Sequence, residues 1–362
     1  MEYEGRLARL QDHLASTDVD ALLVSHLPNV RYLCGFTGSA GALLVSGRKA
    51  VFFTDGRYTA QAREEVRGAR IVIARQPPVT MAAEWLKSNR KKSGARVVGF
   101  DSQHLSVAEH SQLAEILRPN VRLRKAPPVV ERARMMKDAD EIRSLRAAIR
   151  LGESLFAVAS EAIRPGVAET KVAAEMEYAA RRAGAEGMSF DTIIASGVRS
   201  ALPHGRASTA QIPANGFVVC DFGIILAGYC SDMTRTVHVG KPSEQARGMY
   251  AAVREAQEAA INAVRPGVPA GEIDLAARRV LARQGFGRYF THSTGHGVGL
   301  EIHEMPRIAA RQTERLVEGM VITIEPGVYV SNIGGVRIED MVLVTNTGCE
   351  VLTETSKELL QI

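Results

Sequence analysis

The sequence has few cysteines and no long apolar run. Its 362 residues include only four cysteines, Cys34, Cys220, Cys230 and Cys349, which show neither CxxC spacing nor the pattern of a disulfide framework. No stretch of 18 apolar residues is present, and no cationic N-terminus precedes an apolar segment, so we expect neither a transmembrane helix nor a secretory signal. These absences together predict a cytoplasmic protein with no membrane partner.

The sequence also has little excess of one charge over the other. The 45 Lys and Arg residues nearly balance the 40 Asp and Glu residues, which leaves a net charge of +5 spread along the chain. The one basic run, 87–96, is best explained as a solvated helix end and turn, so we expect no nucleic-acid partner. With 46% hydrophobic and 23% charged residues the chain is typical of globular proteins, and its length predicts two domains.

Residues 1–128 have the pattern of a separate α/β domain. Leu7, Leu10 and Leu14 recur at helical spacing near the start. Strands are expected at 21–25, 41–46, 49–54, 71–74 and 97–100, and helices around 81–86 and 107–117. A Pro-Pro pair ends this domain. We then expect a charged connector at 131–137, a long helix near 139–163, and a second domain over 129–362.

The second domain contains an internal repeat. The segment Ala-Ile-Arg-Pro-Gly-Val-Ala at 162–168 recurs as Ala-Val-Arg-Pro-Gly-Val-Pro at 263–269. Each copy follows a helical stretch rich in Ala and Glu and precedes another helix, expected at 169–183 and 271–284. Each half then ends in strands that carry two acids. This parallel order predicts an α+β domain with approximate two-fold internal symmetry and with its acids at the centre.

Four acids lie in apolar runs, where an isolated carboxylate is costly to bury. Asp221 and Asp232 belong to what reads as a hairpin in the first half. Glu325 and Glu339 belong to hydrophobic strands in the second half. One such acid alone is usually a cap, a turn residue or part of a surface ion pair. Four buried acids are different, because they repel one another unless protons or cations neutralise them.

Three histidines, His292, His296 and His303, lie in the stretch 292–304, separated by glycines that permit close approach to a ligand. A surface loop is the simple alternative for this stretch taken alone. An imidazole together with four carboxylates suits a pair of divalent cations such as Mn²⁺, Co²⁺ or Zn²⁺. Such a pair can activate a water and polarise a carbonyl. The segment 303–307 is not an HExxH motif, because it lacks the second histidine.

Six motifs together resemble the pita-bread metallopeptidases and, within them, the Xaa-Pro peptidases aminopeptidase P and prolidase. They are Leu-Pro-His-Gly at 202–205, Asp-Phe-Gly at 221–223, Ser-Asp-Met-Thr-Arg at 231–235, the stretch 292–304, Glu-Pro-Gly-Val-Tyr at 325–329 and Gly-Val-Arg-Ile-Glu-Asp at 335–340. The first domain resembles the family's creatinase-type N-terminal domain at 32–38 and 53–58. The implied fold is an α+β pita-bread catalytic domain with two-fold pseudo-symmetry, preceded by a smaller α/β domain.

The resemblance also implies two divalent metal ions, with Mn²⁺ favoured and Co²⁺ or Zn²⁺ as alternatives. Their ligands would be Asp221, Asp232, His296, Glu325 and Glu339. Asp232 and Glu339 would bridge the two ions and Asp221 would hold one of them. His296 and Glu325 would hold the other.

Further residues match the family's substrate side. His204, His292 and His303 would orient the scissile carbonyl, contact the proline end and stabilise the oxyanion, one of them as an imidazolium. Tyr329 and Arg337 would steer the bridging acids and assist proton movement. Glu325, or a group near it, would pass a proton to the leaving proline nitrogen.

The implied function is hydrolysis of the Xaa-Pro bond of small proline-containing peptides by a homodimer. We favour aminopeptidase P, because nothing in the sequence announces a dipeptide-only barrier, and we keep prolidase as the alternative. Asp55, Arg57 and Tyr58 are candidates for the rim of such a barrier, although a strand-to-helix turn with an N-cap explains them better. The extra N-terminal domain disfavours a methionine aminopeptidase. The complete ligand set disfavours a metal-free creatinase and a non-enzymatic binding protein.

Overall fold

The computed structural model describes the backbone of residues 1–362 and the side chains of residues 1–89 and 94–362. The chain divides into two compact units, Met1–Arg134 and Met135–Ile362. The basic run at 87–96 includes residues 90–93, so the prediction of a solvated basic surface there falls partly outside the described side chains. Among the described residues, none of the helices is both long and apolar enough to span a bilayer.

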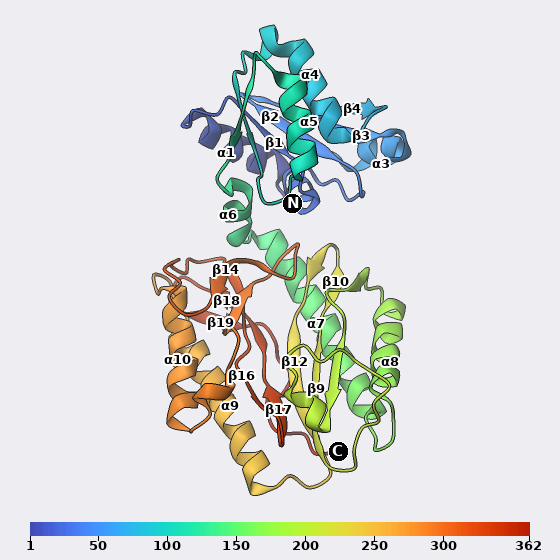
Figure 1. Cartoon of the computed structure of the whole chain (residues 1–362), viewed down its shortest axis with the longest axis vertical. Coiled ribbons are helices and arrows are strands. Elements are labelled where there is room, and N and C mark those ends of the chain that lie inside the picture. The colour runs from blue at the N-terminus through green and yellow to red at the C-terminus, as the bar shows by residue number, and fades with distance from the viewer. The chain divides into compact units, whose positions relative to one another are not determined.

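The N-terminal unit is built on a six-stranded sheet of order β4-β3-β2-β1-β5-β6 (Figure 1). Its strands are β1 (Ala21–Val24), β2 (Ala42–Ser46), β3 (Lys49–Asp55), β4 (Arg70–Ala74), β5 (Val97–Phe100) and β6 (Arg122–Lys125). The first three strands form an antiparallel meander, whereas β4, β5 and β6 each pair in parallel with a neighbour. The predicted strands are therefore confirmed.

Helices cover both faces of this sheet, which is why its central strands are continuous apolar runs rather than alternating ones. These helices are α1 (Tyr3–Ala15), α2 (Leu27–Cys34), α3 (Thr59–Glu65), α4 (Pro78–Ser93) and α5 (Val107–Leu117), and a further helix, α6 (Val129–Met135), follows the last strand. The strand residues Leu23, Leu44 and Phe53 pack against α4 and α5, which cover one face of the sheet (Figure 1). The turn after β3 contains a short 3-10 helix, η1 (Gly56–Tyr58), in which the Arg57 amide donates to the Asp55 carboxylate, so the predicted capped turn is confirmed.

Some elements of this unit were not predicted from the sequence, and one local prediction was wrong. Helix α2 was not predicted, because eight residues with Pro28 in the first turn are too few to display a periodic apolar face. The charged connector expected at 131–137 is instead largely helical, since α6 occupies residues Val129–Met135. Two of its charged residues bond Asn29 of α2: Arg134 is buried and donates to the Asn29 side chain, and Glu131 accepts from it.

The C-terminal unit repeats one arrangement twice. In the first half α7 (Ala139–Ala162) and α8 (Glu169–Arg182) pack on strands, and in the second half α9 (Glu244–Ala263) and α10 (Ala270–Arg283) do the same. Figure 1 shows the strands between α8 on one side and α9 with α10 on the other. Both helix pairs are connected through the Arg-Pro-Gly segments, so the repeat read from the sequence corresponds to a structural repeat.

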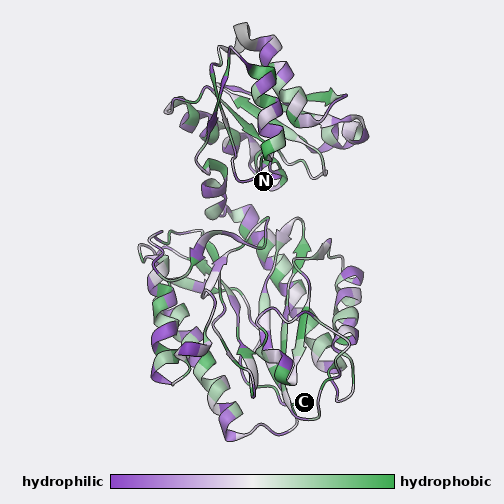
Figure 2. Cartoon of the chain, in the orientation of Figure 1, coloured by the Kyte–Doolittle hydropathy of each residue, from purple (hydrophilic) through white to green (hydrophobic). Residues whose placement is uncertain are grey.

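The strands of this unit form several small sheets. Those of the first half are β7 (Gly187–Met188), β8 (Ile193–Ser196), β9 (Gly216–Phe222), β10 (Ile224–Leu226), β11 (Tyr229–Cys230) and β12 (Met233–Val239). Those of the second half are β13 (Gly295–Gly297), β14 (Glu304–Ile308), β15 (Val321–Ile324), β16 (Gly327–Val330), β17 (Gly334–Arg337), β18 (Asp340–Val344) and β19 (Cys349–Val351). In Figure 2 the strands are largely apolar, whereas the helices have one apolar and one polar face, so the core lies between helices and strands.

Candidate metal centre

The four acids lie at strand ends or breaks rather than all within strands. Asp221 is in β9 as expected, but Asp232 comes just before β12 and Glu325 just after β15. Glu339 occupies the two-residue break between β17 and β18. The prediction that all four lie inside strands was thus wrong in three cases. Side chains at strand ends and breaks do not have to alternate between the two faces of a sheet, so these acids can turn toward one point.

Thr234 joins the two halves of the unit at this point. It lies opposite Asp221 in the antiparallel β9–β12 pair. Its carbonyl accepts a hydrogen bond from the Glu339 amide at 3.1 Å, and its hydroxyl donates to Glu339 Oε2 at 2.7 Å. An acid of the second half is therefore held directly beside the strand pair that carries Asp221 and leads to Asp232.

His296, on β13, completes the group. Its Nε2 lies 3.6 Å from Asp232 Oδ2 and 3.4 Å from Glu325 Oε1. Asp232, His296 and Glu339 each offer one ligand atom, and these atoms all lie within 4.8 Å of one another. The ring Nδ1 donates to the Gly297 carbonyl at 3.0 Å, which leaves Nε2 as the nitrogen with a lone pair facing the acids.

Burial and mutual repulsion shift the pKa values of this group toward its uncharged forms. Burial, and then the charge of neighbouring acids, raise the pKa of Asp232 and of Glu339 well above their ordinary values. Burial likewise raises the pKa of Glu325 to about 8, although Arg337 opposes this. Burial lowers the pKa of His296 to about 4, so its imidazole is neutral at pH 7. A buried cluster of this kind is stabilised by cations, which replace the protons the acids would otherwise keep.

One atom tests whether a divalent cation suits these residues. Asp221 Oδ2 accepts a short hydrogen bond from the Arg337 guanidinium. Asp221 Oδ1 is buried and has no hydrogen-bond partner among the described residues. A buried carboxylate oxygen without a partner is costly unless something else coordinates it. Because the surrounding donors are carboxylate oxygens and one imidazole nitrogen, a divalent transition-metal ion fits.

His292 and Tyr329 lie beside the acids in a hydrogen-bonded chain. His292 Nδ1 donates to the Ser293 carbonyl at 2.8 Å, so Nε2 accepts from the Tyr329 hydroxyl at 2.9 Å. That hydroxyl also accepts from Arg337 Nη1 at 2.6 Å. Burial, with the nearby positive charge of Arg337, lowers the pKa of His292 to about 4. His292 is therefore a neutral imidazole at pH 7. The expectation that one of the three histidines acts as an imidazolium stays a prediction.

The other two histidines are more exposed. The His303 ring meets the His296 ring edge to face, with centroids 4.4 Å apart. Partial burial, and then the charge of His204, lower the pKa of His303. His204 is exposed just after the 3-10 helix η2 (Gly197–Ala201), and Arg337 donates to the carbonyl of the preceding Pro203 at 3.0 Å. The structure thus brings all ten sequence-predicted site residues into one region of the unit.

Several residues of this region were missed by sequence reasoning. Thr234 belongs to a motif that the sequence displayed, but its bond to Glu339 depends on strand pairing. Asp274 and Arg278, on α10, are spaced four apart and read as an ordinary helix ion pair, yet both bond the segment 290–294. Only their apolar surroundings, with Asp274 on the buried face of α10, gave a signal.

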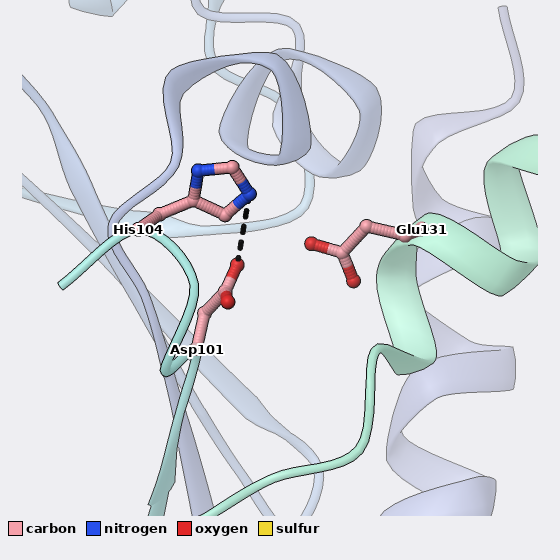
Figure 3. Close-up of side chains that lie close together, drawn as sticks. All are labelled: Asp101, His104 and Glu131. Atoms are coloured by element: carbon pink, nitrogen blue, oxygen red, sulfur yellow. Dashed lines mark ion pairs between the residues drawn. The ribbon is translucent and has the colours of Figure 1, made fainter. Parts of the chain in front are cut away.

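A second group of possible ligands lies in the N-terminal unit. Figure 3 shows Asp101, His104 and Glu131 facing one another, with ligand atoms within 4.8 Å. His104 Nε2 lies 3.7 Å from Asp101 Oδ2, and Asn29 donates to Glu131 Oε1 at 2.5 Å. These contacts account for much of the group, and His104 is exposed. The group alone therefore does not establish a metal site.

The repeated helix-and-strand unit, with four carboxylates and an imidazole between its halves, is that of a pita-bread metallopeptidase. Residues 143–346 match the model of metallopeptidase family M24, and residues 6–136 match that of the creatinase/prolidase N-terminal domain. The chain therefore belongs to metallopeptidase family M24. The sequence-based recognition of the family, the fold class and the expectation of a metallopeptidase are confirmed.

Relatives of known description match over almost the whole chain. A Xaa-Pro dipeptidase of Pyrococcus horikoshii is 38% identical over 358 residues, which cover 98% of this chain and 98% of that protein. The structure resembles that of a Xaa-Pro dipeptidase from Bacillus anthracis, with a TM-score of 0.94 and 39% identity over 99% of each chain. It also resembles an X-Pro aminopeptidase from Thermotoga maritima, with a TM-score of 0.89 and 34% identity over 99% of this chain and 100% of that one.

Proposed function

We propose that this chain is a Xaa-Pro dipeptidase that uses two divalent metal ions. The observation that carries the proposal is the meeting of three buried acids and the partly buried Glu325 with the neutral His296, including an Asp221 oxygen that lacks a partner among the described residues. The dipeptidases of Pyrococcus horikoshii and Bacillus anthracis support the alternative of the sequence prediction over its first choice, aminopeptidase P. The Thermotoga maritima X-Pro aminopeptidase is the reason to test both.

The metal ligands of the proposal are the five residues expected from the sequence. Asp221, Asp232 and Glu339 would hold one ion, and His296 and Glu325 would hold the other together with Asp232 and Glu339. The 4.8 Å grouping of Asp232, His296 and Glu339 supports a common ion for these three. When bound, the ions supply Lewis acidity and an activated water. Mn²⁺ is the first candidate and Co²⁺ or Zn²⁺ the alternatives, because oxygen-rich sites accept all three.

The remaining roles in the proposal belong to side chains rather than to the ions. His204 and His303, which are exposed beside the acids, contact the substrate carbonyl and the proline end. His292 and Tyr329 form a hydrogen-bonded pair that orients the hydroxyl toward the site. Glu325 passes a proton to the proline nitrogen. That nitrogen has no N–H in the substrate, so it cannot bind a backbone acceptor and must gain a proton to leave.

The decisive assay compares peptides that share one N-terminus. Purified protein is stripped with a chelator, reloaded with Mn²⁺, and given Leu-Pro, Leu-Pro-Gly and a Leu-Pro pentapeptide. We expect rapid release of leucine from the dipeptide and at least tenfold slower release from the longer peptides. Equal rates on all three substrates favour the aminopeptidase, and no release from any of them refutes both. Elemental analysis of the reloaded protein gives the metal identity and the number of ions per chain.

The proposal has two further parts that rest on family resemblance. Residues 1–128 act as the N-terminal domain and 129–362 as the catalytic domain, and the protein works in the cytoplasm as a homodimer on small proline-containing peptides. Light scattering coupled to size-exclusion chromatography measures the mass of the assembly, and a monomer at assay concentration contradicts the dimer.

A further inference from the structure

Helix α10 holds the segment that carries His292. Asp274 is 1% exposed and pairs with Arg278, one turn later on the same helix, at 2.7 Å. Asp274 Oδ1 also accepts from the Thr294 hydroxyl at 2.8 Å and from the Thr294 amide at 3.2 Å. A buried carboxylate of α10 therefore binds Thr294, which lies between His292 and His296.

Arg278 bonds the same segment at two further points. Its Nη2 donates to the His292 carbonyl at 2.6 Å, and its Nη1 donates to the Phe290 carbonyl at 3.1 Å. The guanidinium also lies over the Phe290 ring, 4.3 Å from its centroid. A planar guanidinium can hold this many acceptors in fixed directions at once. The backbone is thus tied to α10 at residues 290, 292 and 294.

The tied segment leads directly into the metal centre on two routes. Through its side chain, His292 accepts from the Tyr329 hydroxyl at 2.9 Å. Through its backbone, the Thr294 carbonyl accepts from the Glu325 amide at 2.8 Å. A displacement of residues 290–294 therefore moves both the histidine and the backbone of an acid in the cluster.

We propose that Asp274 and Arg278 are positioning residues of the peptidase site, which fix the His292 segment and, through Thr294, the placement of Glu325. This inference rests on the proposed function for its kinetic consequence but not for its structural one. Groups that orient site residues commonly change activity about 10- to 100-fold when replaced. Displacements of about 1 Å are enough to produce such losses.

A general role in stability is the alternative, because a buried carboxylate that loses its cation destabilises a fold wherever it lies. Conservative variants separate the two roles. Arg278→Lys keeps the charge next to Asp274 but cannot reach both carbonyls, whereas Asp274→Asn keeps an acceptor for Thr294 but loses the charge. Arg283→Lys is the matched control, since Arg283 is on the same helix and pairs with Glu255 at the surface.

Hydrogen–deuterium exchange of the full-length protein is a readout that does not need activity. For Arg278→Lys and Asp274→Asn we expect at least tenfold faster exchange in peptides covering 290–297, with peptides of α7, α8 and the N-terminal unit unchanged. Arg283→Lys leaves 290–297 as in the wild type. Unchanged exchange in 290–297, or faster exchange throughout the C-terminal unit, overturns the positioning role.

Kinetics with Leu-Pro supply the second readout. We expect Arg278→Lys to lower kcat about 10- to 100-fold while KM changes less than threefold and the metal content stays that of the wild type. Thr294→Ser, which keeps the hydroxyl, retains activity, whereas Thr294→Val loses it to a similar extent. A rise in KM alone overturns the inference. If the wild type does not cleave Xaa-Pro peptides, the proposed function fails, and the exchange experiment still decides the positioning role.

Discussion

Arg337 donates a hydrogen bond to the hydroxyl of Tyr329 at 2.6 Å, and both side chains are buried. The same guanidinium bonds Asp221 and the Thr234 hydroxyl, so it places a positive charge beside the acids. Burial raises the pKa of Tyr329 to about 12, so the phenol keeps its proton and donates it toward His292. Tyr329 therefore connects Arg337 to His292 through two hydrogen bonds, so a shift of the arginine would move the histidine.

Replacing Tyr329 by Phe removes this connection without changing the ring. We expect a loss of about 1–3 kcal/mol in the free energy of unfolding, because a buried acceptor and donor lose their common partner. We also expect a fall of about 10- to 100-fold in kcat on Leu-Pro. Steady-state kinetics and chemical denaturation measure the two effects.

The control is Tyr250→Phe. The Tyr250 hydroxyl donates to the Lys357 carbonyl at 3.1 Å and is likewise buried, but it lies among the helix contacts of α9. This variant has a comparable loss of stability and wild-type kcat. Equal activity of the two variants contradicts a role of Tyr329 in the site.

Metal binding should be visible in the thermal stability of the protein. A ligand at a hundredfold excess over its Kd adds about 2.7 kcal/mol to the free energy of unfolding. Mn²⁺ should therefore raise the Tm of the chelator-treated wild type, and Asp221→Asn should lose most of that rise together with about two orders of magnitude in turnover. Asp18→Asn, whose side chain is 78% exposed, keeps both. An undiminished Mn²⁺ shift in Asp221→Asn contradicts the assignment of this residue as a ligand.

The sequence was informative wherever local periodicity decides the structure. The two helix pairs around Arg-Pro-Gly were predicted because each helix has more than ten residues and one apolar face. Helix α2 was not, because a few residues with an early proline show no period. The strand ends near Asp232 and Glu325 were also missed, since a single irregular residue leaves no trace in an apolar run.

The residues of the site could be predicted from motifs, but the hydrogen bonds that connect them could not. The acids and histidines were grouped by their chemistry and by resemblance to a family. The Thr234–Glu339 bond spans 105 residues and exists only because β12 lies beside the break between β17 and β18. The bonds from Arg278 to the His292 segment depend on how α10 packs, which no spacing rule predicts. Contacts between distant segments are properties of the packed fold.

Glu131 gives a pH-dependent prediction outside the metal centre. Burial raises its pKa, and the neighbouring Asp101 raises it further, against the opposing hydrogen bond from Asn29. A carboxyl whose pKa is higher in the folded state contributes stability below its unfolded pKa, and that contribution is lost as the pH rises through the folded value. Glu131→Gln should therefore be more stable than the wild type at pH 7, with the difference disappearing near pH 4.

The fluorescence of Trp85, the single tryptophan of the chain, reports this unfolding because Trp85 lies in α4 of the same unit. Glu115→Gln, an exposed position on α5, carries the same charge change and should leave the pH dependence as it is. A wild type that is more stable than Glu131→Gln at pH 7 contradicts the argument.

Gly295 should be irreplaceable because of the backbone of β15. An added Cβ would lie 1.9 Å from the Thr323 carbonyl oxygen, which belongs to the strand that carries the chain to Glu325. Gly295→Ala must therefore push β13 and His296 away from β15. We expect a loss of several kcal/mol in the free energy of unfolding, or a failure to fold, and no detectable Mn²⁺ shift in Tm.

Gly248 is the control, because a Cβ there meets nothing within 4 Å and the residue is exposed on helix α9. Gly248→Ala should raise stability by about 0.5–1 kcal/mol through helix propensity and keep the Mn²⁺ shift. If both variants behave alike, close approach of the backbone is not what requires glycine beside His296.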